Sequence, residues 1–497
     1  MNELPKKILA ILILGIGMAG CATHRVEQAP PPAADSVPAD AHVHHPPGEA
    51  EHHGGHERHE PPAAGHHITR DAHESAAAAS GAQHEMWMRA VGGGWQLMGM
   101  GQLFPIVTIG SPFDRETPLH RTEWSVTQPA AMLNLESPGG RVTLRTTLNF
   151  EGITLRDGEL NLGGWGEGFI DSRHPHTLLH EAMLSLNLWD VAGGAFSLSA
   201  GKGFAPYGTD DPMARPVLKY PTNHHLSQIL ERWTVNGIYL LRGWSLEAGI
   251  FGGSEPTGPY DLSNIRSFPD SWSTRVTRRF GDGFGPLAPW EVSTSYARVN
   301  HAHDTLRDTV TLINAAVRHA RRYAVGDIYG LVEASRSRHT RAASDFSLLA
   351  ETQLTRGRHQ PYYRVEYATR PEFSRDGVAG EDEFFRYDYR RHPIGGTRWR
   401  IHSLGYGYQL GGSSVSGRPF VELQHHRIWW DRGFGSLAPE RLFRTNSVWS
   451  LSAGMRLYFG GGPMRMGSYG ILDPMSVMHR GMEGEAHHGG EEHPHHH

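Results

Sequence analysis

The chain has 497 residues and a formal net charge of −5 at neutral pH, and its isoelectric point near 6.7 gives no basic field for nucleic acid. Only 38% of the residues are hydrophobic, and no apolar run of about eighteen residues occurs beyond the extreme N-terminus, which excludes helical membrane spans. A single cysteine excludes an intramolecular disulfide framework, while 60 glycines and 13 tryptophans suit the turns and aromatic girdles of a barrel.

Residues 1–20 are typical of a secretory signal, because a pair of lysines precedes an apolar core too short to span a bilayer. Cys21 follows Met18-Ala19-Gly20, which resembles the lipobox of bacterial lipoproteins, although Met18 stands where that family prefers Leu. The resemblance implies cleavage before Cys21 and its lipidation, and Ala22 resembles the family's outer-membrane sorting pattern. The alternative is ordinary cleavage nearby, with Cys21 of no consequence.

Residues 21–85 are rich in Pro, Ala, Glu and His and lack aliphatic periodicity, which predicts a disordered linker. Imidazole is the commonest protein ligand for Zn, Cu and Ni, so its histidines are candidate metal ligands. Their irregular spacing favours buffering of ions over a tight, selective site. The alternative is a solvated, pH-responsive segment with no selected ligand. The candidate ligands are His42, His44, His45, His52, His53, His56, His59, His66 and His67.

Residues 86–459 consist of short segments in which apolar and polar side chains alternate. In residues 141–151, Val142, Leu144 and Leu148 alternate with polar residues such as Thr143 and Arg145. A period of two indicates strands with one apolar and one polar face, and the alternation returns in residues 449–459 and elsewhere. Segments of about ten residues match a tilted strand that crosses a bilayer.

The joins between these segments alternate in length, as in outer-membrane barrels, where short turns lie on the periplasmic side and long loops outside. We predict an all-β fold, a transmembrane antiparallel β-barrel of about 16 strands (14–18), with disordered His-rich tails on the periplasmic side. A soluble β-sandwich or propeller does not predict this alternation of joins. Short joins are predicted at residues 137–140, 190–194, 242–243, 320–322, 356–359 and 411–414, and long ones at 110–123, 155–179, 205–228, 253–270, 371–398 and 430–446.

Residues 455–459, Met-Arg-Leu-Tyr-Phe, close the last strand and resemble the C-terminal signal by which the barrel assembly machinery recognises outer-membrane proteins. The aromatic residue usually ends such chains, whereas 38 residues follow here. The barrel region also resembles a poorly characterised group of porin-like bacterial outer-membrane proteins with His-Pro-His and Asn-His-His loops, represented by residues 173–176 and 223–225. Membership implies a barrel and supplies no known substrate.

The alternation also predicts that charged side chains of both signs face the lumen. Mixed signs favour a water-filled pore with a transverse field, although opposed charges could instead pair and plug the lumen. The predicted pore-lining residues are Arg141, Arg145, Glu151, Glu247, Glu351, Arg364, Glu366 and Arg456.

Five histidines of the long outer loops are weaker metal candidates, because porin-like barrels often fold a long loop into the lumen. They are His174, His176 and His180 around the second long loop and His224 and His225 in the third. The alternative is a loop held by histidine hydrogen bonds.

Residues 460–497 form a Met- and His-rich tail that we predict to be disordered. Thioethers such as Met464, Met466 and Met475 suit Cu(I), and the imidazoles suit Cu, Zn or Ni. The histidines offered as ligands are His487, His488, His493, His495, His496 and His497.

These patterns predict a Gram-negative outer-membrane channel for small solutes or metal ions, with lipids as neighbours and no required cofactor. Possible bound ions are Cu, Zn or Ni. One alternative is a closed structural or adhesion barrel. Another is a lipid hydrolase, but neither Gly-x-Ser-x-Gly nor His-Glu-x-x-His occurs, so we predict no enzyme.

Overall fold

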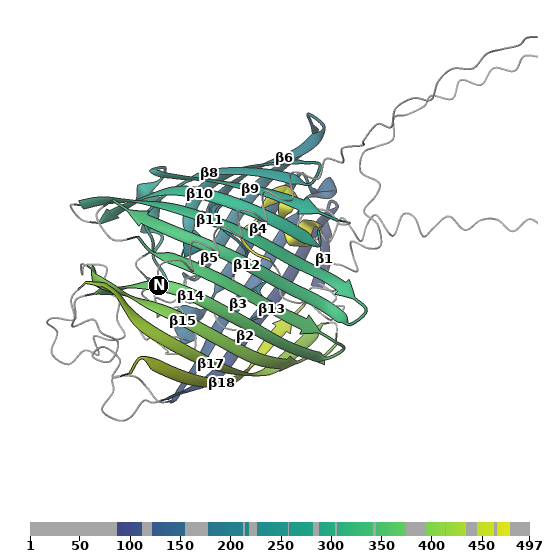
Figure 1. Ribbon diagram of the computed structural model, residues 1–497. Helices are drawn as coiled ribbons and strands as arrows, with labels where there is room; N and C mark the ends of the chain where they lie inside the picture. The colour runs from purple at the N-terminus through teal and green to yellow at the C-terminus, as the bar shows by residue number, and fades with distance from the viewer. Residues whose placement is uncertain are drawn as a thin grey trace, which may run out of the picture. The chain divides into compact units, whose positions relative to one another are not determined.

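The strands of the computed structural model form one sheet that closes on itself (Figure 1). No helix among the described residues is long and apolar enough to cross a membrane. Cys21, the linker and the terminal histidines lie outside the described residues. The structure describes residues 87–111, 122–154, 177–211, 214–217, 226–256, 258–281, 288–303, 306–340, 344–373, 393–412, 414–433, 445–461 and 465–477.

Sixteen strands form the wall, as predicted, and each pairs antiparallel with its chain neighbours until β18 pairs with β2 and closes the ring. They are β2 (Trp95–Ser111), β3 (Thr122–Glu136), β4 (Val142–Asn149), β5 (Leu179–Val191), β6 (Gly194–Gly203), β7 (Arg232–Leu241), β8 (Trp244–Phe251), β9 (Ser271–Phe280), β10 (Trp290–His303), β11 (Leu306–Tyr323), β12 (Gly326–His339), β13 (Phe346–Thr355), β14 (His359–Phe373), β15 (Pro393–Tyr408), β17 (Val415–Gly433) and β18 (Ser447–Phe459).

Short elements complete the fold. They are the strands β1 (Trp87–Gly92) and β16 (Leu410–Gly411), the helical turns η1 (Pro138–Gly140), α3 (Glu151–Thr154), η5 (Ser263–Ser267) and η8 (Gly470–Leu472), and a last helical turn at residues 474–477. β1 pairs with β2 beyond the end of β18, and the Trp87 N–H donates to the Gly460 carbonyl at 2.8 Å. The first strand therefore continues the line of the last one along β2.

The wall is polar inside and apolar outside. In β4, Thr143, Arg145 and Thr147 are buried, whereas Leu144 is 39% exposed. Apolar side chains such as Leu186, Leu246 and Leu451 are likewise about half exposed on the outer face. This inverts the pattern of a soluble protein and confirms the predicted alternation of an outer-membrane barrel, whose outer surface contacts lipid.

Most short joins lie at one end of the barrel and most long joins at the other, which we call the short-turn end and the long-loop end. The exceptions are the nine-residue join from β9 to β10 at the short-turn end and the two-residue join from β10 to β11 at the long-loop end. The predicted positions hold within a few residues, with one clear difference. β11 continues to Tyr323, so its turn lies at residues 324–325 and not at 320–322. The predicted turn contains Arg321 and Arg322, but both pair with β12, and Gly326 provides the positive φ that starts the return strand.

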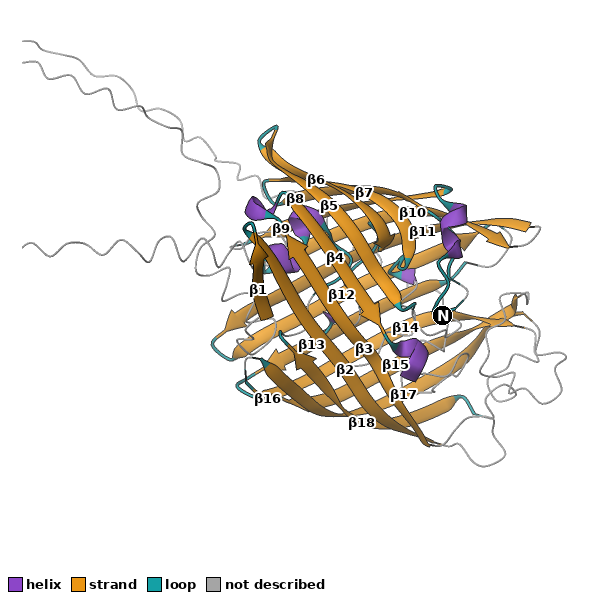
Figure 2. Cartoon of the chain, turned by 180° about the vertical axis from the view of Figure 1, so that it is seen from behind, coloured by secondary structure: helices purple, strands orange, loops and turns teal. Residues whose placement is uncertain are grey.

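The described residues of two segments lie in the barrel interior. The third loop (residues 204–231) joins β6 to β7, and the C-terminal segment (residues 465–477) follows β18 and carries η8, drawn in yellow in Figure 1. The helical turns of the chain also stand out against the strands in Figure 2. We predicted disorder from residue 460 onward. For residues 465–477 this prediction is wrong, because these residues are folded and mostly buried.

Candidate pore interior and its two inserted segments

The C-terminal segment is fixed to the inner wall by a buried carboxylate. Asp473 Oδ2 lies 3.0 Å from Arg145 Nη1 on β4, and its other oxygen accepts a hydrogen bond from Asn134 Nδ2 on β3 at 2.9 Å. The backbone N–H groups of Met475 and Ser476 also donate to Asp473 Oδ1, so this residue starts the last helical turn. One side chain thus both shapes the segment and attaches it to the wall.

Tyr469 attaches the segment at a second point. Its hydroxyl donates to Glu181 Oε1 on β5 at 2.8 Å and accepts the backbone N–H of Phe204 at 2.8 Å. Burial raises the pKa of the Tyr469 hydroxyl well above its ordinary value, and the neighbouring Glu181 raises it further. The hydroxyl therefore keeps its proton and its role as donor through the neutral range.

Apolar side chains of the segment pack against the inner wall and the third loop. Ile471 and Leu472 cluster with Ile238 and Leu240 of β7, and all four are buried. Met466 and Met475 belong to another cluster, whose members are 6% exposed or less. Their thioethers, predicted as Cu(I) ligands, lie in the structure among apolar neighbours. The other members of this cluster are Met98, Met100, Ala130, Met132, Met183, Phe204, Leu230 and Tyr469.

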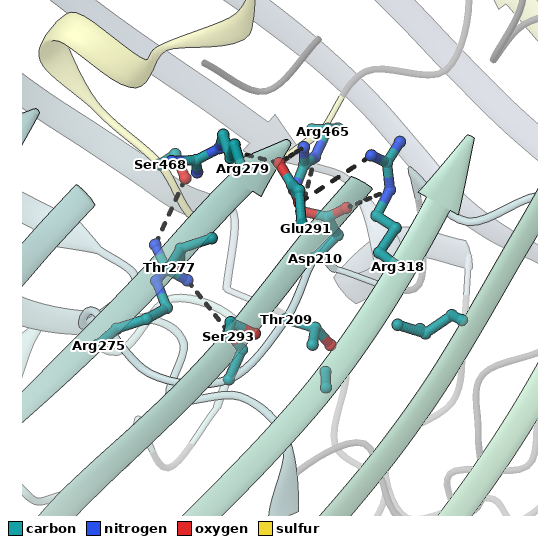
Figure 3. Close-up of a pocket in the computed structure, with 13 residues that line it drawn as sticks. Thr209, Asp210, Arg275, Thr277, Arg279, Glu291, Ser293, Arg318, Arg465 and Ser468 are labelled. Atoms are coloured by element: carbon teal, nitrogen blue, oxygen red, sulfur yellow. Dashed lines mark hydrogen bonds and ion pairs between the residues drawn. The ribbon is translucent and has the colours of Figure 1, made fainter. Parts of the chain in front are cut away.

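Arg465, the first residue of the segment, joins the third loop to the wall (Figure 3). It pairs with Asp210 of the loop at 2.7 Å and with Glu291 of β10 at 2.8 Å. Arg279 of β9 also binds Glu291, at 3.0 Å. Burial alone would lower the pKa of Arg465, but Asp210 and Glu291 hold it above its usual range. The tail, the loop and the wall therefore meet in one ion-pair network.

Arginines hold the far part of the third loop against the wall. Arg418 of β17 donates to the Pro216 carbonyl at 2.8 Å, and Arg456 of β18 donates to the Arg215 carbonyl at 2.7 Å. The guanidinium of Arg215 pairs with Glu333 of β12 at 3.3 Å. A long loop folded into the lumen was expected, and these contacts confirm it for the third loop.

The root of the third loop rests on a buried polar cluster. His180 Nδ1 lies 2.8 Å from Glu231 Oε1, which also accepts the backbone N–H of Thr177 at 2.7 Å. Lys202 Nζ donates to Thr177 Oγ1 at 2.5 Å and to the Leu179 carbonyl at 2.7 Å. His180 therefore takes part in a hydrogen bond that holds the root of the third loop, as in the alternative to a metal site.

The remaining loop histidines, His174, His176, His224 and His225, lie outside the described residues. Within the described ranges no group of three or more His, Cys, Asp or Glu side chains is placed to hold a metal ion.

Seven of the eight predicted pore-lining residues are buried. Glu247 binds Arg275 at 2.6 Å, Arg364 binds Glu351 at 2.7 Å and lies 3.7 Å from Glu366, and Glu151 accepts the Gln128 N–H. Arg145 and Arg456 contact the inserted segments, as described above. Arg141 differs, because β4 begins only at Val142 and leaves Arg141 exposed in the turn. Five of the seven buried side chains thus form ion pairs, and the other two, Glu151 and Arg456, form hydrogen bonds.

Sequence reasoning missed the C-terminal segment and the arginine contacts to loop carbonyls. A local signal for the segment does exist, since Tyr469, Ile471, Leu472 and Val477 interrupt an otherwise polar and Met-rich tail. The contacts to carbonyls leave no such signal, because any arginine at an inward-facing position of a strand can reach a backbone oxygen.

No protein-family model and no curated protein matches the chain. Among solved structures, it resembles a loop L8 deletion mutant of OmpT, an outer membrane protein of Vibrio cholerae, at 13% identity and a TM-score of 0.42, over 74% of this chain and 100% of that chain. It also resembles an anion-selective porin from Comamonas acidovorans (10% identity, TM-score 0.41, 73% and 99% coverage) and Salmonella typhi OmpF (10%, 0.41, 74% and 98%). Similarity this distant carries no inference about solute or activity.

Proposed function

We propose that this chain is an outer-membrane channel of the porin type whose conduction is controlled by its own C-terminal segment. A closed sixteen-strand wall is wide enough to enclose an aqueous lumen. The ion pair between Asp473 and Arg145 carries the proposal, because it attaches a piece of the chain inside the barrel without any covalent link to β4. When this segment leaves, the lumen behind it becomes available to small solutes.

The segment acts at the short-turn end, which we assign to the periplasm. It follows the last residues of β18 and contacts β5, β6 and β7 where these strands meet their short turns. We further propose that the last strand is recognised by the barrel assembly machinery, and that lipids of the outer membrane surround the wall.

The metal link is the second part of the proposal. The chain continues from Val477 directly into the sequence that carries His487 and the five histidines after it. Imidazoles at this density collect Cu, Zn or Ni ions. Ions bound there would change the charge beside the segment and thereby the fraction of time it spends inside the barrel.

Single-channel conductance in planar bilayers tests both parts with two truncations. A chain that ends at Gly461 lacks the segment and the histidines, and we expect larger or more frequent conductance steps than in the full chain. A chain that ends at Val477 keeps the segment and loses the histidines. We expect it to conduct as the full chain does in the absence of metal and to lose any response to added Cu(II) or Zn(II).

Each alternative gives a different result. A closed structural or adhesion barrel stays silent even when it ends at Gly461, which would overturn the channel proposal. Equal metal responses of the full chain and the Val477 truncation would overturn the metal link alone. Lipid hydrolysis by the purified barrel that is lost in His176→Ala would indicate the enzyme.

A further inference from the structure

Two arginines face each other on the outer surface of the wall. Arg400 of β15 and Arg427 of β17 are direct cross-strand partners, and both alternate with buried neighbours. Side chains in this position have Cβ atoms about 5 Å apart, and like charges there destabilise a sheet. The guanidinium carbon of Arg400 lies 5.5 Å from the centroid of the Trp429 ring. Arg427 donates a hydrogen bond to Asn446 Oδ1 at 2.6 Å. Neither forms an ion pair with another described residue.

The arginine pair lies at the level of an aromatic belt. Trp429 and Trp449 are 38% and 47% exposed on the same face, and the ring of His425 stacks on Trp449 at 4.2 Å. Toward the short turns the outward positions become apolar, as Leu404 and Leu423 show with exposures of 60% and 43%. Aromatic belts mark the depth at which lipid headgroups meet hydrocarbon. The two arginines are therefore placed to meet a headgroup.

An apolar groove lies on the outer face of β10 to β14, next to the strand that carries Arg400. Val332, Ala350 and Tyr363 help to line it, and Gly330 keeps it open, because a Cβ there would meet only the Glu351 carbonyl oxygen, at 3.8 Å. The Tyr363 hydroxyl lies 2.6 Å from His402 Nδ1, and His402 is the next outward residue after Arg400 on β15. Val365 of the groove is the cross-strand partner of His402, so this part of the groove lies two residues along β15 from Arg400.

We propose that Arg400 and Arg427 bind the phosphate of a membrane lipid whose acyl chain lies in this groove. Two guanidinium groups offer a phosphate the parallel N–H donors that it binds best. The bound phosphate removes the repulsion between the two cations, and the groove accepts a chain of the same molecule. This site is separate from the lumen and does not depend on whether the barrel conducts.

The test compares two lipids and two pairs of arginines on the full chain in detergent. Native mass spectrometry gives the affinity for phosphatidic acid, which carries a terminal phosphate, and for phosphatidylcholine, in which choline shields the phosphate. We expect Arg400→Gln with Arg427→Gln to weaken phosphatidic acid binding by roughly tenfold or more, as loss of charge-assisted hydrogen bonds does. Arg298→Gln with Arg338→Gln removes the same charge from the same outer face and is expected to change it little.

The groove has its own matched pair of variants. Gly330→Leu fills the groove without a backbone clash and is expected to weaken phosphatidic acid binding, whereas Gly237→Leu, also outward and also with room for a Cβ, is expected to leave it unchanged. Equal effects of the two arginine pairs would show general charge attraction and overturn the site. Full competition by inorganic phosphate would mean that the ligand is a free anion and not a lipid. A change in oligomeric state with Gly330→Leu would mean that the groove is an interface between copies of the chain. Either result overturns the proposal.

Discussion

The third loop and the C-terminal segment occupy the same interior but are held there differently. The loop is joined to the wall at both ends, through β6 and β7, and wall arginines donate to its carbonyl groups. Within the described residues the segment is joined to the wall through β18 alone, and its far end is held by side-chain contacts such as those of Asp473 and Tyr469. Chain connectivity keeps the loop inside, whereas the segment is inside only while its contacts outweigh the entropy of a free tail. Of the two, the segment is therefore the one suited to open a pore.

Asp473→Asn is expected to have the largest effect on how firmly the C-terminal segment is held in the barrel relative to the third loop. The variant removes the charge that pairs with Arg145 but lies outside the wall strands, so the barrel still folds. Loss of one partner of a buried pair costs about 2–3 kcal/mol here, because Arg145 retains Glu181 at 3.3 Å. We expect trypsin to cleave after Arg465 at least tenfold faster, as measured by mass spectrometry.

Asp190→Asn is the matched control for this variant. It makes the same change in an exposed turn at the short-turn end of β5. Cleavage after Arg465 should remain at the wild-type rate. If Asp473→Asn were also to leave the rate unchanged, the segment would not depend on its ion pair.

A smaller effect is expected from Tyr469→Phe. The ring still fills its place in the methionine-rich cluster, but Glu181 loses a donor and the Phe204 N–H loses an acceptor. Buried groups left without partners cost about 1–3 kcal/mol. We expect cleavage after Arg465 and the open fraction in bilayers to rise together. A rise in cleavage without a rise in conductance would separate release of the segment from opening of the pore.

High pH should act through the same hydroxyl. Because the pKa of buried Tyr469 lies above its ordinary value of 10.0, the protonated hydroxyl stabilises the inserted segment fully below pH 10. This contribution is lost as the pH rises above 10 and through the raised pKa. We expect conductance to increase a few-fold between pH 8 and pH 11 in the wild type. Tyr469→Phe lacks this hydroxyl and should lose the part of the increase that depends on it, so an equal increase in both chains would contradict the assignment.

The sequence predicts the wall better than the contents of the barrel. A period of two in residues such as Thr143, Leu144 and Arg145 reflects a physical constraint on every strand, because one face meets lipid and the other meets water or charge. The alternation of long and short joins then fixes the strand number. The prediction for Arg141 fails because the alternation in the sequence extends to one residue before Val142, the first residue of β4.

The inserted segments follow no period, so the sequence indicates them poorly. The composition of the tail is that of a disordered chain, and Asp473 shows no feature that identifies Arg145, 328 residues away, as its partner. Pairing of the interior charges is equally non-local, because it depends on which side chains meet across the lumen. The sequence predicts that such charges exist and leaves open whether they line a pore or close it.

The smallest effect on retention is expected from Glu333→Gln in the third loop's ion pair. The substitution removes the carboxylate beside Arg215, as Asp473→Asn does for the segment, but the loop keeps its two chain connections and the hydrogen bonds from Arg418 and Arg456. Trypsin cleavage after Arg215 should therefore stay within about twofold of wild type, while the reversal potential shifts because the charge of the lumen has changed. Cleavage after Arg215 as fast as that after Arg465 in Asp473→Asn would mean that ion pairs hold both segments and that the loop, too, can leave the interior.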